Sequence, residues 1–115
     1  MNKCSYIHAN NIPDGEQLAT VAELFKCMGD PCRLAMLSLL HAHELPVGEI
    51  AQRLQHTPSA VSHQLRLLRS LRLVRTRRDG RRILYALDDQ HVAELLEVAF
   101  VHSRHPHVDD RDNEK

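Results

Sequence analysis

The chain has 115 residues, a length typical of one domain with short tails. Fifteen Lys and Arg balance fifteen Asp and Glu, and 43% of the residues are hydrophobic, which excludes a disordered chain. No apolar run reaches the roughly 18–20 residues of a membrane helix, and the first residues lack a signal core, so we expect no membrane partner. Three cysteines (Cys4, Cys27 and Cys32) are too few for a disulfide framework, which indicates a reducing cytoplasm.

The balanced total charge hides a basic segment in the middle of the chain. Residues 53–82 hold nine arginines and a single acidic residue, Asp79, for a net charge of +8. The segments on either side, 1–52 and 83–115, are both net acidic. Arginines can simply solvate a helix face, but this density indicates a surface that binds a polyanion.

Apolar residues at helical spacing predict a first helix over residues 16–28. Gly29 ends it, and Asp30 with Pro31 begins a second helix that fades around residues 41–44. A short third helix is expected over 47–54. Thr57 then caps a fourth helix, after a turn of about three residues that is typical of a helix-turn-helix.

Two β-like runs follow, over residues 73–78 and 82–87, on either side of Asp79-Gly80, a strong hairpin signal. Asp88 or Asp89 is expected to cap a last helix that runs to about residue 104. The pattern predicts a mainly α fold of the winged helix-turn-helix type. We place its domain at 16–106, with a flexible tail over 1–15 and a charged tail over 107–115.

The fourth helix and the hairpin carry the predicted contacts to double-stranded operator DNA. Short polar side chains on the first turns of the helix can reach base edges, and the arginines suit phosphates or a narrow minor groove. For Ser62 and His63 the alternative is packing or capping. The predicted DNA-binding residues are Ser59, Ser62, His63, Gln64, Arg66, Arg77, Arg78, Arg81 and Arg82, with Arg69, Arg72 and Arg75 as further phosphate contacts.

Nine histidines are the unusual feature of the composition. His102 and His105 both fall within about 40° of His91 around the axis of the last helix, at roughly 100° per residue. His91 and His102 are nevertheless about 16.5 Å apart along the axis, at ~1.5 Å per residue, so one helix cannot bring both to one ion.

An antiparallel second copy of the last helix removes that difficulty. A homodimer with this helix at its seam, and a twofold axis near Val98, would bring His91 of one chain to His102 and His105 of the other. Asp89 would add an oxygen ligand. The spacing therefore predicts two symmetric metal sites per dimer.

Three stretches resemble the bacterial ArsR/SmtB metal-sensing repressors: Phe-Lys-Cys-Met-Gly-Asp-Pro-Cys-Arg-Leu (25–34), Pro-Ser-Ala-Val-Ser-His-Gln-Leu (58–65) and Leu-Tyr-Ala-Leu (84–87). The resemblance implies a dimeric repressor that leaves its operator when an inducer binds, derepressing metal efflux or sequestration genes. One site of that family uses two cysteines on the third helix. Residues 44–50 here read Glu-Leu-Pro-Val-Gly-Glu-Ile, so a thiolate site is not expected there.

The last helix resembles that of the zinc and cobalt sensors of the CzrA type, which carry Asp-x-His, ten residues and His-x-x-His. That resemblance implies Zn(II) as inducer at Asp89, His91, His102 and His105, with Co(II) or Ni(II) as alternatives. It also implies that His102 hydrogen-bonds toward the end of the recognition helix near Arg72.

Several alternatives stay open. Cys4, His8 and His107 could add ligands. The stripe formed by His91, His102 and His105 could also be merely solvated or packed. Cys27 and Cys32 could serve a repressor that responds to thiol oxidation, although core or helix-start positions are expected for both. A zinc hydrolase is disfavoured because four protein ligands leave no open position for water, so we expect no enzyme. His41, His43 and His56 are expected in surface loops.

Overall fold

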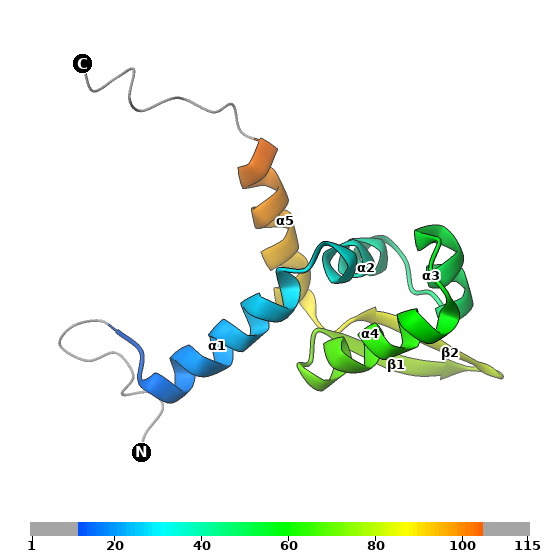
Figure 1. The fold of residues 1–115 in the computed structure, drawn as a ribbon, viewed down its shortest axis with the longest axis horizontal. Helices are drawn as coiled ribbons and strands as arrows, with labels where there is room; N and C mark the ends of the chain where they lie inside the picture. Colours follow the sequence, from blue (N-terminus) through cyan, green and yellow to red (C-terminus); the bar gives the residue numbers. More distant parts are fainter. Residues whose placement is uncertain (1–11, 105–115) are drawn as a thin grey trace.

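The computed structural model describes residues 12–104. Its elements follow in the order α1 (Gly15–Met28), α2 (Pro31–Ala42), α3 (Val47–Leu54), α4 (Pro58–Ser70), β1 (Val74–Asp79), β2 (Arg82–Leu87) and α5 (Gln90–Arg104) (Figure 1). The strands form an antiparallel hairpin, the sole sheet within the described range. This order confirms the predicted winged helix-turn-helix. The expected domain limits at 16 and 106 stay a prediction.

Side-chain caps set four of the helix starts. Asp14, Asp30, Thr57 and Asp89 each accept a hydrogen bond from the backbone N–H three residues ahead, at 2.8, 3.0, 3.1 and 3.1 Å. Such a bond satisfies one of the N–H groups that a helix start leaves without a partner. The choice left open between Asp88 and Asp89 is thus decided for Asp89.

The helix-turn-helix needs one backbone conformation that most residues avoid. Gln55 ends α3 with a left-handed φ of 58°, and its N–H bonds back to α3. The chain thereby turns sharply into Thr57 and α4. Gly80 also has a left-handed φ, of 66°, in the turn at the tip of the hairpin. Glycine adopts this conformation without steric cost because it has no Cβ.

The core lies between α2, α3, α4 and the base of the hairpin. Its fully buried side chains belong to all of these elements, and α1 and α5 each add a few more at one end. The largest of them are Met36, Leu37, Ile50, Val61, Leu65, Leu68, Leu73, Val74 and Leu96. Burial of these apolar side chains fixes α4 against the scaffold and leaves its opposite face in solvent.

The connection between α2 and α3 pairs with the hairpin. Leu45 N–H donates to the Tyr85 carbonyl at 3.0 Å, and Tyr85 N–H donates to the Leu45 carbonyl at 2.8 Å. Leu45 is itself buried. The wing is therefore attached to the helix-turn-helix through its second strand.

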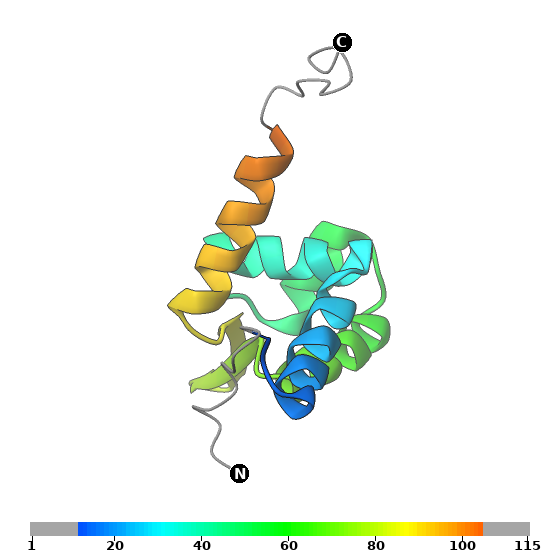
Figure 2. The same cartoon turned by 90° about the vertical axis from the view of Figure 1, so that its left-hand side faces the viewer.

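α1 and α5 extend away from the body of the molecule (Figures 1 and 2). Both carry large apolar side chains in solvent: Phe25 is 54% exposed and Val98 is 66% exposed, with Leu18, Val21 and Val101 also exposed. The apolar stripe predicted for the first helix is thus only partly buried within one chain. Among residues 12–104, no helix is both long and apolar enough to cross a bilayer.

Candidate nucleic-acid interface and metal-ligand stripe

α4 presents its polar face to solvent. Val61, Leu65 and Leu68 are buried on one side, while Ser59, His63 and Arg66 are exposed on the other. These three predicted DNA-reading residues therefore stand where a duplex could reach them. This placement is what a recognition helix requires.

Two of the predicted DNA-reading residues of α4, Ser62 and Gln64, are half-buried. Gln64 Oε1 accepts a hydrogen bond from Arg33 Nη1 at 3.1 Å, and Arg33 Nε also donates to the Cys27 carbonyl at 2.8 Å. Arg33 thus links the end of α1 and the start of α2 to the recognition helix. Sequence reasoning missed this link because the two residues lie 31 positions apart.

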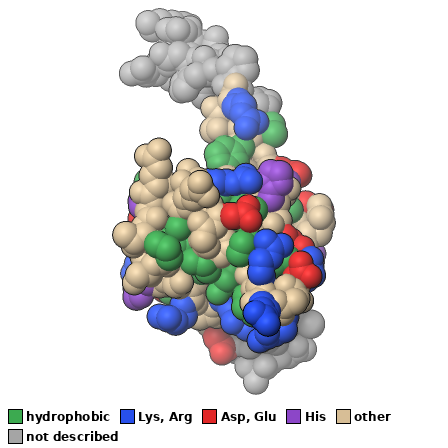
Figure 3. Space-filling model, turned by 90° about the vertical axis from the view of Figure 1, so that its right-hand side faces the viewer, with side chains coloured by type: hydrophobic (Ala, Val, Ile, Leu, Met, Phe, Trp, Pro, Cys, Tyr) green, Lys and Arg blue, Asp and Glu red, His purple; other side chains and the backbone are tan. Residues whose placement is uncertain are grey.

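Figure 3 shows Lys and Arg side chains on the lower part of one face of the molecule. The hairpin contributes five exposed arginines, Arg75, Arg77, Arg78, Arg81 and Arg82. They are not equivalent. Arg77 donates three hydrogen bonds to the Glu44 carboxylate, at 2.7, 2.8 and 3.0 Å. Arg82 lies 3.8 Å from Glu49 and 3.7 Å from Asp79, contacts too long for a good hydrogen bond.

The Glu44–Arg77 contact also changes the titration of both groups. The hydrogen bonds from Arg77 hold the pKa of the Glu44 carboxyl below its usual range. The same bonds raise the pKa of Arg77. The pair is therefore ionised across the physiological range of pH.

At the start of α5, Asp89 and His91 form a small polar cluster. Asp89 Oδ1 accepts from Val92 N–H at 3.1 Å, and Asp89 Oδ2 lies 3.5 Å from His91 Nδ1. The Val92 N–H, and then the neighbouring His91, hold the pKa of the Asp89 carboxyl below its usual range. The His91 side chain is 89% exposed. A carboxylate and an exposed imidazole are a donor set that Zn(II), Co(II) and Ni(II) accept.

His102 lies on the last turn of the same helix and is exposed, beside a shallow hollow lined by Glu97, Val98 and Val101. No group of three His, Cys, Asp or Glu within residues 12–104 of a single chain could hold a metal ion. The structure therefore separates Asp89 and His91 from His102, as the helix arithmetic requires. His105, like Cys4, His8 and His107, lies outside the described residues.

The structure does not bring His102 to Arg72 within one chain. Arg72 lies in the turn after α4, with a left-handed φ of 61°. Figures 1 and 2 both place the C-terminal end of α5 away from α4. A link from His102 to the recognition helix would therefore have to run between two chains.

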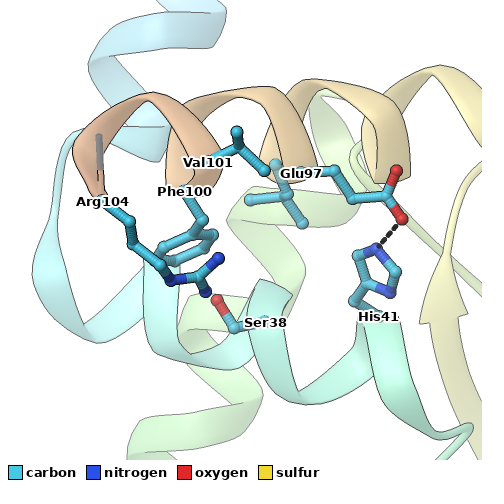
Figure 4. Close-up of a pocket in the computed structure, with 7 residues that line it drawn as sticks. Ser38, His41, Glu97, Phe100, Val101 and Arg104 are labelled. Atoms are coloured by element: carbon cyan, nitrogen blue, oxygen red, sulfur yellow. Dashed lines mark hydrogen bonds and ion pairs between the residues drawn. The ribbon is translucent and has the colours of Figure 1, made fainter. Parts of the chain in front are cut away.

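His41 belongs to the last turn of α2, and the expectation of a surface loop was wrong for it. Its Nε2 lies 3.1 Å from Glu97 Oε2 of α5, so the pair joins two helices (Figure 4). Ser38, Phe100 and Arg104 line the same hollow between α2 and α5, and Arg104 lies 5.8 Å from the Phe100 ring. The His41–Glu97 pair is a polar link that holds α5 to the body of the protein.

The cysteines occupy the predicted core and helix-start positions. Cys27 is buried, and burial raises the pKa of its thiol. Cys32 is half-buried near the start of α2, with its Sγ 3.5 Å from His56 Nε2 in the turn before α4. The sequence offered no signal for this pairing, because His56 is 24 residues away.

Comparison with known proteins identifies the family. Residues 30–76 match the family described as "Bacterial regulatory protein, arsR family". The chain is 45% identical over 95 residues to the HTH-type transcriptional regulator NmtR of Mycobacterium tuberculosis, covering 83% of this chain and 79% of NmtR. It is 34% identical over 111 residues to the cadmium resistance transcriptional regulatory protein CadC homolog of Staphylococcus aureus, covering 90% and 92%.

Solved structures agree with this similarity. The solution structure of apo-NmtR superposes with a TM-score of 0.72 at 45% identity, over 84% of this chain and 81% of that one. The homodimeric winged helix-turn-helix DNA-binding domain of a possible ArsR-family regulator from Mycobacterium bovis superposes with a TM-score of 0.74 at 32% identity, over 82% and 91%. The chain belongs to the ArsR/SmtB family of bacterial transcriptional regulators.

Proposed function

We propose that this protein is a metal-responsive transcriptional repressor of the bacterial cytoplasm. As a homodimer it binds operator DNA in the metal-free state, and it leaves DNA when Zn(II) binds between the two α5 helices. The observation that carries the proposal is the division of one exposed ligand stripe between the two ends of α5, with Asp89 and His91 at one end and His102 at the other.

The dimer follows from what one chain leaves unburied. Leu18, Val21 and Phe25 form a stripe on α1 at helical spacing, and Val98 and Val101 form a second on α5. Both helices project from the body, so a second copy can cover both stripes at once. The homodimeric relative from Mycobacterium bovis supports this assembly.

The ligand residues then complete each other across the seam. Asp89 and His91 of one protomer would share a metal ion with His102 and His105 of its partner, which gives two sites per dimer. A bound Zn(II) ion would tie the two α5 helices together, in addition to the apolar contacts that Val98 and Val101 would make. Three nitrogens and one oxygen suit tetrahedral Zn(II), and Co(II) accepts the same set, whereas Ni(II) would prefer further ligands such as His8 or His107.

DNA binding rests on α4 and the wing. Ser59, His63 and Arg66 are exposed on α4, and Arg78 and Arg81 are exposed on the hairpin with no carboxylate partner among residues 12–104. Ser62, Gln64 and Arg82 are further proposed contacts. Arg77 is engaged by the Glu44 carboxylate instead.

The test is operator binding with the DNA upstream of the protein's own gene, titrated with Zn(II) and then with EDTA. Zn(II) should release the wild type, and His102→Ala and His105→Ala should stay bound at the same metal concentration. Parallel titrations with Co(II) and Ni(II) rank the metals. Release of the two variants by Zn(II) as readily as the wild type would overturn the interhelical site.

A further inference from the structure

The wing arginines divide between the two faces of the hairpin. Side chains alternate along a strand, so Arg77 and Arg78 point to opposite faces. In the register of the hairpin Arg77 is opposite Leu84, which is 5% exposed, and Arg78 is opposite Ile83, which is 40% exposed. Near the tip of the hairpin, the face of Arg77 is therefore turned toward the body of the protein and that of Arg78 toward solvent, whereas both faces are buried at the base, where Val74 and Leu87 are 1% and 8% exposed.

Glu44 is held at the edge of the same hairpin. Its neighbour Leu45 makes two backbone hydrogen bonds with Tyr85 and is buried, so the backbone at Glu44 has little freedom to move away. The Glu44 carboxylate receives both Nε and Nη2 of Arg77. This fork geometry is the strongest way for an arginine to engage a carboxylate.

We propose that Glu44 and Arg77 form an internal brace that positions the wing, and that Arg77 stays on Glu44 when DNA is bound. Arg78 and Arg81 then contact the phosphates in its place. This inference rests on the proposed DNA binding. The physical reason is that release of Arg77 would leave the Glu44 carboxylate without its partner beside a polyanion, where a negative charge is repelled.

The first experiment measures how the affinity of the full chain for operator DNA depends on salt, with EDTA present. Each phosphate contact contributes about 0.9 to the slope of log K against log salt. Arg78→Ala and Arg81→Ala should each lower the slope by about 0.9. Arg77→Ala should leave the slope unchanged and weaken binding severalfold at every salt concentration. A loss of about 0.9 in the slope of Arg77→Ala would overturn the brace.

A double-mutant cycle adds a second readout. Glu44→Gln, Arg77→Ala and the double variant should weaken binding by a similar factor, because each breaks the same pair. Glu49→Gln is the matched control, since it removes an equal charge nearby whose contacts to Arg53 and Arg82 are long, at 3.9 and 3.8 Å. It should leave affinity unchanged or raise it. If Glu44→Gln raised the affinity for DNA as much as Glu49→Gln does, Glu44 would only repel DNA, and the brace would be overturned.

The outcomes separate this inference from the proposed function. If Zn(II) releases the wild type from DNA but Arg77→Ala lowers the slope of log K against log salt, the brace alone is overturned. An intact brace in a protein that Zn(II) does not release from DNA overturns the metal-sensing function alone. Failure of the wild type to bind the operator at low salt overturns both.

Discussion

Asp89 has two roles in the structure of a single chain. Its Oδ1 caps α5, and its Oδ2 lies beside His91 Nδ1. The two roles can be separated by substitution, because asparagine also caps helices well and alanine does not. Asp89→Asn and Asp89→Ala should both bind Zn(II) roughly tenfold or more weakly by calorimetry, if the carboxylate serves the metal. Only Asp89→Ala should lose several degrees of Tm. Wild-type zinc affinity in Asp89→Asn would exclude a metal role for the carboxylate.

The lowered pKa of Asp89 predicts how the cap depends on pH. The pKa of Asp89 is lowered in the folded state, chiefly by the Val92 N–H. The ionised cap therefore contributes its full amount to stability above the ordinary pKa of an aspartate. It is lost as the pH falls through the lowered pKa. The Tm difference between wild type and Asp89→Ala should therefore be constant from neutral pH to about pH 5 and shrink below about pH 4. A difference that does not change at low pH would show that the carboxylate charge plays no part in the cap.

The two described cysteines should differ in reactivity. Cys27 is buried with a raised thiol pKa, whereas Cys32 is half-buried beside His56. Because the thiolate is the nucleophile, iodoacetamide at neutral pH should modify Cys32 at least about tenfold faster than Cys27, measured by peptide mass spectrometry with EDTA present. Equal rates would contradict the burial of Cys27. An oxidant that releases the wild type from its operator while Zn(II) does not would favour the thiol-responsive alternative.

Among the elements, α5 buries one face against its own chain and leaves the other face in solvent. Leu96 is 1% exposed and packs into the core, while Val98, two residues on, lies largely in solvent. Leu96→Ala should lower the free energy of unfolding by about 2–5 kcal/mol, measured by denaturant titration at a fixed protein concentration. Val98→Ala is the matched substitution on the other face. It should weaken self-association in sedimentation velocity and leave the α-helical content unchanged. Unaltered self-association would place the seam elsewhere.

α2 and the hairpin show how much of each element was predictable. The caps, the proline starts and the Asp79-Gly80 turn act within three or four residues, so all the helices and the hairpin could be predicted from local pattern. The pairs Arg33–Gln64, His41–Glu97 and Glu44–Arg77 could not, since each joins residues more than thirty positions apart. Arg77 illustrates the consequence: its residue type indicated a phosphate contact, and only its neighbour in space indicates a different role.

For the whole molecule, the proposed function requires that metal and DNA compete through the dimer. If metal weakens DNA binding by some factor, DNA must weaken metal binding by the same factor, typically about 5–150-fold. In the proposed dimer, His102→Asn should reduce this coupling more than it reduces zinc affinity, because it removes an imidazole whose second nitrogen would donate to a backbone carbonyl near the end of the partner's recognition helix. Zinc calorimetry with and without operator DNA measures both the zinc affinity and its coupling to DNA binding. Full coupling in His102→Asn would exclude a role for that hydrogen bond.

Local patterns along the chain were enough to predict the order of elements, the winged helix-turn-helix and the spacing of Asp89, His91 and His102 along one helix. These follow from hydrophobic period, capping and turn chemistry, which depend on near neighbours. The folded chain was needed to show which arginines of the wing are engaged, that Cys32 lies beside His56, and that α1 and α5 leave apolar stripes in solvent. The physical reason is that burial and ion pairing depend on residues brought together by packing of the whole chain, about which the local sequence pattern carries no information.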